Sequence, residues 1–155
     1  MPTKSQDYSL RPPELISELR QLLPADCVLG DAEALRPYEC DGLSAYRELP
    51  LAVVIPTDVG QICDVMRYCG AHGLPVVARG AGTSLSGGAR PHKDGIVLSL
   101  ARFNQILAID PMNRTARVQP GVRNLAISEA VAHIGLYYAP DPSSQIACSI
   151  GGNVA

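Results

Sequence analysis

The chain has 155 residues, enough to bury one hydrophobic core, and its 46% hydrophobic and 18% charged content is ordinary for a globular domain. A net charge of −2 argues against a nucleic-acid-binding surface, which would need clustered lysine and arginine. No apolar run approaches the roughly 18 residues that cross a bilayer, and residues 1–14 lack the apolar segment of a secretory signal.

The five cysteines and three histidines predict neither disulfides nor a metal site. The cysteines are odd in number and scattered, and they contain no C-x-x-C pair. We therefore expect reduced structural thiols in a cytoplasmic protein. No histidine has Asp, Glu or Cys at metal-ligand spacing, and His72 and His133 fall at expected helix C-termini, where a cation suits the helix dipole.

The amino-terminal third predicts a mainly helical extension. Residues 1–11 are expected to be disordered. Pro12 then opens a helix whose apolar residues form one stripe, and Pro24 ends it. A short helix over residues 32–36 and an irregular stretch over residues 38–46 follow.

A βαβ unit is predicted next. Residues 51–55 are a continuous apolar run, as buried parallel strands show. Thr57 is expected to cap a helix that continues at helical spacing to Gly73. Residues 74–78 form the second strand, and ligand sites of open α/β sheets favour the carboxyl end of such a strand.

The pattern then changes from parallel units to a hairpin. Residues 96–100 predict a third strand. Residues 106–110 and 115–119 flank the turn sequence Pro-Met-Asn-Arg, which is a hairpin signal. Parallel units followed by a hairpin favour an α+β fold over a pure doubly wound sheet.

The last part of the chain predicts one helix, one strand and a glycine turn. Pro120 and Gly121 are expected to open the helix, and Gly135 to stop it. Tyr137 is expected to begin another strand. Residues 150–155 contain a second pair of glycines, which predicts a turn.

The most informative segment is the loop that follows the second strand, over residues 79–88. It holds four glycines, two serines and a threonine, with Arg79 and Arg90 at its rims and no acid between them. Glycine lets a backbone approach a ligand closely, and successive backbone N–H groups form a nest that binds anions. The loop therefore predicts a site for a nucleotide pyrophosphate.

Two common phosphate motifs do not fit this loop. A P-loop needs Lys and Ser or Thr after its last glycine, and here Gly87 is followed by Gly88 and Ala89. A dinucleotide fingerprint needs a helix after Gly-x-Gly-x-x-Gly and an acid about 20 residues on. Neither is present beyond Gly82. Taken alone, the loop fits a glycine-rich surface turn as well as a ligand site.

With these elements in order, the chain resembles the vanillyl-alcohol-oxidase-type (PCMH-type) FAD-binding domain. Three blocks carry the resemblance: Pro56-Thr57, residues 79–88, and Asp-Pro-Ser-Ser at 141–144 followed by residues 149–153. The resemblance implies a small parallel βαβ subdomain followed by a mixed or antiparallel one. It assigns residues 50–155 to roughly the first half of such a domain, preceded by an extension over residues 1–49. The chain is then expected to be the amino-terminal portion of a longer protein.

More closely, residues 38–46, 116–125 and 137–144 resemble the FAD-binding subunits of bacterial glycolate oxidases. That resemblance implies FAD-dependent oxidation of glycolate or a similar 2-hydroxy acid, alongside a second flavin-domain-like subunit and an iron–sulfur subunit. It implies a cytoplasmic protein, or one held at the membrane periphery through its complex. The alternatives are a D-lactate dehydrogenase of the same family and a non-catalytic, truncated flavin-binding module.

The resemblance also implies which residues hold the cofactor. Covalent members carry a histidine where this chain has Thr83, so FAD is expected to be non-covalent. The catalytic and metal-binding residues are expected beyond Ala155, so none is assigned, and the 155 residues alone are expected to be inactive. The implied cofactor-binding residues are Pro56, Arg79, Gly80, Ala81, Gly82, Thr83, Ser84, Leu85, Pro120, Gly121, Asp141, Pro142, Ser143, Ser144, Ser149, Ile150, Gly151, Gly152 and Asn153.

Overall fold

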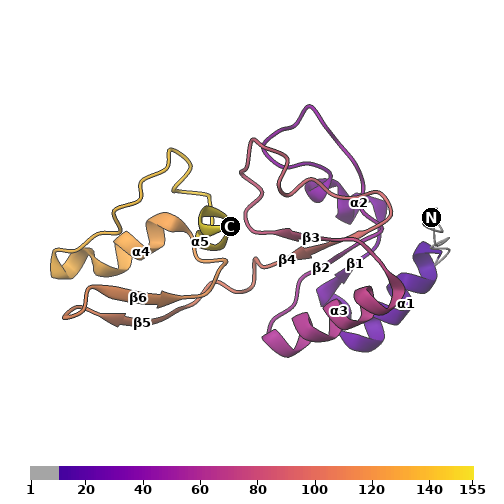
Figure 1. Ribbon diagram of the computed structural model, residues 1–155, viewed down its shortest axis with the longest axis horizontal. Helices are drawn as coiled ribbons and strands as arrows, with labels where there is room; N and C mark the ends of the chain where they lie inside the picture. The colour runs from indigo at the N-terminus through magenta and orange to yellow at the C-terminus, as the bar shows by residue number, and fades with distance from the viewer. Residues whose placement is uncertain (1–10) are drawn as a thin grey trace, which may run out of the picture.

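The computed structural model describes residues 11–155, which form two lobes joined by a short connection (Figure 1). The disorder predicted for residues 1–11 falls, Arg11 apart, outside the described residues. One lobe is built on a four-stranded sheet, sheet A, and the other on a two-stranded sheet, sheet B. No helix within residues 11–155 has the length and apolar character needed to cross a membrane.

Sheet A confirms the predicted βαβ unit, and the third predicted strand lies between the two strands of that unit. Its order is β1-β2-β4-β3, in which β2, β4 and β3 are parallel and β1 is antiparallel to β2. Helix α3 connects β2 to β3, and β4 lies between these two strands. The bounds are β1 Val28–Leu29, β2 Ala52–Val54, α3 Val59–His72, β3 Val76–Arg79 and β4 Ile96–Ser99.

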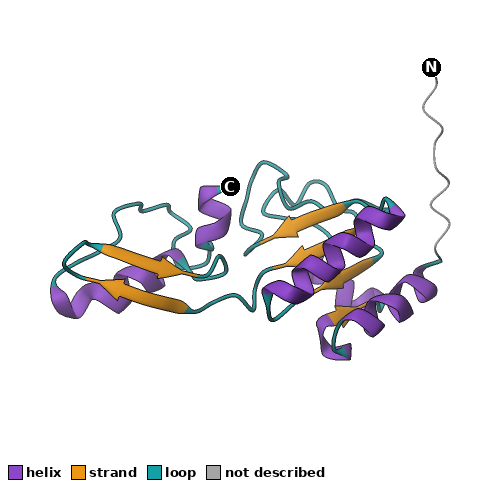
Figure 2. Cartoon of the chain, turned by 60° about the horizontal axis from the view of Figure 1, so that its bottom comes forward, coloured by secondary structure: helices purple, strands orange, loops and turns teal. Residues whose placement is uncertain are grey.

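Helices cover both faces of sheet A, which explains why its central strands are apolar throughout (Figure 2). All residues of β2 and β4 are buried. Helix α1 (Pro12–Leu22) and α3 pack on one face through Leu15, Leu19 and Val65. Helix α2 (Ala32–Leu35) contributes Leu35 to the other face, with Val53 and Val97. Two short 3₁₀ turns, Ala25–Cys27 and Arg36–Tyr38, flank α2.

The N-cap of helix α3 lies one residue later in the chain than the sequence predicts. The Asp58 carboxylate accepts a hydrogen bond from the Gln61 amide nitrogen at 2.9 Å, so Asp58 and not Thr57 is the N-cap. Thr57 lies outside the helix, and its amide donates to the Gln61 side chain. The helix ends at Gly73, whose φ of +62° is the left-handed conformation typical of a C-cap glycine.

Sheet B confirms the predicted hairpin and, with sheet A, the α+β class. Strands β5 (Ile106–Asp110) and β6 (Thr115–Val118) are antiparallel. The Asp110 carboxylate closes the turn by accepting hydrogen bonds from the Asn113 amide, the Asn113 side chain and the Met112 amide. These bonds, those from Asn113 first, hold the pKa of that carboxyl below its usual value.

Three predictions for the carboxyl-terminal part are wrong. Helix α4 spans Asn124–Val131, followed by a 3₁₀ turn over Ala132–Ile134, and does not begin at Pro120 and Gly121. The Gly121 amide instead donates to the Phe103 carbonyl, which holds this segment as a turn. Within the described residues no strand begins at Tyr137, because its neighbour Tyr138 donates to the Ser128 hydroxyl and two prolines, at 140 and 142, lack the N–H that a ladder needs.

The third correction concerns the second pair of glycines. Residues Ile150–Val154 form a short helix, α5, rather than a glycine turn. The Asn153 amide donates to the Ser149 carbonyl at 3.1 Å, as a helix requires. The glycines serve close packing here, because a Cβ atom on Gly151 would meet the Pro120 side chain at 2.7 Å.

Candidate functional site

The glycine loop takes the place of a crossover helix. Parallel neighbouring strands are usually joined by a helix, but residues 80–95 connect β3 to β4 as an irregular loop. The loop starts at the carboxyl end of β3, as the sequence predicts, and lies on the side of sheet A that faces the other lobe (Figure 1). The fold therefore leaves the glycines free to form one wall of a site.

Two adjoining clefts lie where the loop meets the end of the chain. The larger measures about 480 Å³ and the smaller about 220 Å³, and they share residues of β3, the glycine loop and α5. The larger is lined by Ala78, Gly80, Ala81, Gly82, Thr83, Ser84, Gly88, Ala89, Ser144, Cys148, Ser149, Gly152, Asn153 and Ala155. The smaller is lined by Ala78, Arg79, Gly80, Leu100, Pro120, Gly151, Gly152 and Ala155.

The backbone of the glycine loop has two features expected of an anion-binding nest over residues 82–84. Gly82 has a φ of +71°, which only glycine adopts readily. Within residues 11–155, the amide groups of Gly82, Thr83 and Ser84 donate to no other protein group. Three neighbouring N–H groups therefore remain available to a ligand in a cleft that has no carboxylate side chain in its lining.

A network of side-chain amides and hydroxyls holds the opposite wall against the loop. The Ala81 amide donates to the Ser149 hydroxyl at 3.3 Å. Asn124 is fully buried, and its side chain donates to the Pro140 carbonyl at 2.9 Å and accepts from Asn153 at 3.0 Å. A buried amide without partners is costly. The two bonds of Asn124 therefore hold the segment around Pro140 and the helix that contains Asn153 in place against α4.

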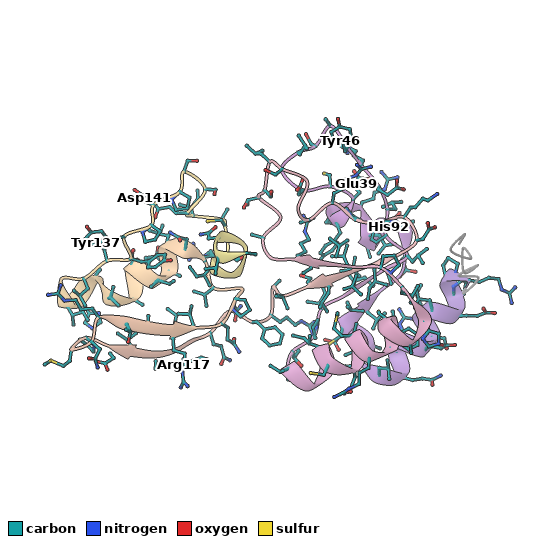
Figure 3. The ribbon with its side chains drawn as sticks, viewed as in Figure 1. Glu39, Tyr46, His92, Arg117, Tyr137 and Asp141 are labelled. Atoms are coloured by element: carbon teal, nitrogen blue, oxygen red, sulfur yellow. The ribbon has the colours of Figure 1, made fainter. Side chains whose placement is uncertain are left out.

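Arg79 supports the loop from behind. Its guanidinium donates to the carbonyls of Cys40 at 2.7 Å and Pro37 at 3.4 Å, and it lies 5.4 Å from the centre of the Tyr38 ring. These contacts join the end of β3 to the segment that follows α2. Arg90, at the other rim, lies 5.2 Å from the ring of Tyr46, which Figure 3 shows on the loops of the same lobe.

Most residues predicted to hold the cofactor come together at these clefts. Gly80, Ala81, Gly82, Thr83, Ser84, Ser144, Ser149, Gly152 and Asn153 line the larger one, and Arg79, Pro120 and Gly151 line the smaller. The residues predicted for the site that line neither cleft are Pro56, Leu85, Gly121, Asp141, Pro142, Ser143 and Ile150.

The residues outside the clefts lie in varied surroundings. Pro56 is fully buried, and the Leu85 side chain is 75% exposed. Gly121 allows close approach, since a Cβ atom there would meet the Leu100 and Phe103 carbonyls. Asp141 accepts a hydrogen bond from the Gln145 side chain, and Figure 3 shows it on the loop above α4.

Sequence reasoning missed several lining residues. Ala78 and Cys148 line the larger cleft as neighbours of predicted positions, and Gly88 and Ala89 line it as well. The glycine-rich composition of residues 79–88 was a signal for Gly88. No local signal pointed to Cys148, which is buried and lies 3.4 Å from the Asn153 side-chain nitrogen.

A family model described as FAD binding domain matches residues 50–155 of the chain. The chain belongs to this FAD-binding domain family. It is 59% identical over 141 residues to glycolate oxidase subunit GlcD of Escherichia coli K12, covering 91% of this chain and 28% of that protein. It is 32% identical over 149 residues to D-lactate dehydrogenase of Anaerostipes hadrus, covering 96% of this chain and 31% of that protein.

A solved structure agrees with the PCMH-type fold. The FAD-binding domain is similar to p-cresol methylhydroxylase with substrate bound, with a TM-score of 0.69 and 28% identity, covering 80% of this chain and 25% of that chain. The predicted PCMH-type class is confirmed. The chain spans less than a third of the length of the curated relatives it matches.

The residues of the FAD-binding domain fit the pyrophosphate of FAD. The loop offers N–H groups without protein partners to an anion, and two of its glycines leave no room for a side chain. A Cβ atom on Gly80 would meet the Ser149 hydroxyl, and one on Gly82 would meet the Arg79 guanidinium. Among residues 11–155, no three His, Cys, Asp or Glu side chains come close enough to hold a metal ion.

Proposed function

We propose that these residues form the pyrophosphate-binding part of an FAD-dependent dehydrogenase that oxidises glycolate or a similar 2-hydroxy acid to the 2-oxo acid. The observation that carries this proposal is the 59% identity to a glycolate oxidase subunit across 91% of the chain. When bound, the flavin would supply the electron acceptor for the hydroxy acid.

Within this proposal the chain's own residues bind and orient. The amides of Gly82, Thr83 and Ser84 would hold the pyrophosphate, and Ser149 would keep the opposite wall in place. Thr83 stands at the position that carries a histidine in covalent members of the resembling family, so FAD would be held by non-covalent contacts alone. Residues that take the substrate proton belong to the remainder of the protein.

The domain boundaries and the assembly are part of the same proposal. Residues 1–49 would be an extension, and residues 50–155 would be the first part of the FAD-binding domain. The family match, which begins at residue 50, supports this boundary. A second flavin-domain-like subunit and an iron–sulfur subunit would complete a glycolate oxidase complex. That complex would be cytoplasmic, or held at the membrane periphery through its other subunits.

The test is flavin reduction in the polypeptide encoded by the full reading frame. The purified protein is expected to show flavin absorbance. In the absence of oxygen, this absorbance is expected to decrease when glycolate is added. D-Lactate and D-2-hydroxyglutarate, added separately, distinguish the candidate substrates. Bleaching by D-lactate but not by glycolate would favour the D-lactate dehydrogenase alternative, to which the 32% identical relative points.

A non-catalytic flavin-binding module is the alternative from another class. It predicts a reading frame that ends at Ala155 and a polypeptide that binds FAD without reduction by any 2-hydroxy acid. Sequencing the downstream region and the bleaching experiment together separate the two functions.

A further inference from the structure

The segment between α2 and β2 packs on the outer side of the glycine loop (Figure 1). It precedes the region that the family model matches, which begins at residue 50. Besides the contact of Tyr46 with Arg90, residues 37–46 meet the loop through the Cys40 carbonyl, Gly42 and the Asp41 carboxylate. Each contact acts on a different part of the loop.

The first contact fixes the start of the loop. Arg79, the last residue of β3, donates to the Cys40 carbonyl at 2.7 Å. Gly80 and then the nest, residues 82–84, follow Arg79 closely in the chain. This bond therefore sets the position at which the loop leaves the strand. A charged donor to a carbonyl is among the stronger hydrogen bonds.

The second contact lies directly behind the nest. A Cβ atom on Gly42 would meet the Ser84 carbonyl at 2.8 Å and the Thr83 carbonyl at 2.9 Å. These are backbone atoms of two residues that line the larger cleft and whose amides have no protein partner, so a side chain at position 42 would displace this part of the loop. Gly42 has no positive φ, so its requirement is one of space.

The third contact fixes the end of the loop. Asp41 is only 6% exposed, and its carboxylate accepts from the Leu43 amide at 2.9 Å and the Ala89 amide at 3.5 Å. Ala89 lines the larger cleft. The bond to Ala89 joins the segment to the last part of the glycine loop, and the bond to Leu43 holds the carboxylate in place within the segment.

We infer that residues 37–46 are part of the FAD-binding machinery, and that Gly42 and Asp41 are positioning residues that set the conformation of the pyrophosphate loop without touching the cofactor. This inference rests on the proposed function. It extends the cofactor site beyond the matched domain into the predicted amino-terminal extension.

The test compares Gly42→Ala with Gly70→Ala in the full-length polypeptide. Gly70 lies in α3, where a Cβ atom would meet nothing within 4 Å, so it is a matched control. The measurements are the FAD dissociation constant of the apoprotein, by flavin fluorescence, and the thermal midpoint without FAD. We expect Gly42→Ala to raise the dissociation constant at least about 10-fold, as loss of about one well-placed hydrogen bond to the ligand would.

Unchanged FAD affinity in Gly42→Ala would overturn the inference, as would a lowered thermal midpoint with normal affinity, since a merely structural glycine gives that result. If Gly42→Ala does not fold, Asp41→Ala gives the same comparison, with the exposed Asp64→Ala as its control. Absence of FAD binding by the wild-type polypeptide would instead contradict the proposed function itself, and the inference with it.

Discussion

The Ala81 amide nitrogen and the Ser149 hydroxyl oxygen are 3.3 Å apart, although the two residues are separated by 68 positions in the sequence. This hydrogen bond joins the glycine loop after β3 to the N-terminal end of α5. It closes the wall of the larger cleft between the two lobes. The arrangement of the loop therefore depends on a segment from the other lobe.

Ser149→Ala should weaken FAD binding through this bond. Loss of the hydroxyl acceptor leaves the Ala81 amide without its partner and costs about 1 kcal/mol, so we expect roughly 5-fold weaker binding in a fluorescence titration. Ser128→Ala is the matched control, because the Ser128 hydroxyl also accepts from a backbone amide, that of Tyr138 at 2.9 Å, away from the cleft. Equal effects of both substitutions on FAD affinity would contradict the prediction.

Gly82→Val should abolish FAD retention while leaving the far-UV circular dichroism spectrum nearly native. The substitution strains a φ of +71° and drives a side chain into the Arg79 guanidinium. Gly87→Val is the control for backbone strain, because Gly87 has a φ of +75° but open space around it. Arg90→Ala should change flavin content little, since an exposed rim charge is screened by solvent. Normal flavin content in Gly82→Val would show that the loop is only a turn.

Acid precipitation should release all flavin from the full-length polypeptide. Thr83 has no ring nitrogen with which to form a bond to the flavin, so we expect non-covalent contacts alone to hold the cofactor. The measurement is the flavin absorbance of the supernatant and of the redissolved pellet after treatment with trichloroacetic acid. Yellow colour that stays with the polypeptide would disprove non-covalent binding.

Tyr68→Phe should destabilise the sheet A lobe below pH 10 more than above it. The Tyr68 hydroxyl donates to the Glu18 carboxylate at 2.6 Å and joins α3 to α1. Burial, and then the Glu18 carboxylate, raise the pKa of Tyr68 above its ordinary value, so the phenol stays protonated in the folded state when the unfolded chain begins to ionise near pH 10. Its contribution, about 1 kcal/mol, is therefore complete below that pH and declines above it.

Urea unfolding between pH 7 and pH 11 measures this effect. Burial also raises the pKa of the Cys69 thiol to about 11, so part of the decline above pH 9 remains in Tyr68→Phe and belongs to Cys69. Tyr137→Phe is the control, because Tyr137 is 77% exposed. A stability loss in Tyr68→Phe that is equal at pH 7 and pH 11 would contradict the assignment.

Local pattern was enough for much of the fold and half of the site. The helical spacing up to Gly73 and the hairpin around Asp110 depend on contacts between residues close in sequence. The apolar run before Pro56 was predictable from its composition, because a strand buried on both faces is apolar throughout. The glycine loop at the end of β3 was predictable for the same reason, because its composition already requires a backbone without side chains.

Contacts between distant residues decided the rest. Whether Gly151 and Gly152 form a turn or a helix depends on Pro120, against which Gly151 packs, and no local rule includes that neighbour. The Arg79 guanidinium donates to the Cys40 carbonyl, 39 positions earlier, and no local pattern indicates that this predicted cofactor-binding residue also joins the loop to the segment after α2. The sequence determined which backbone could bind an anion. The tertiary structure alone decided which segments hold that backbone in place, because the bonding partners meet only after the sheet and the two lobes have formed.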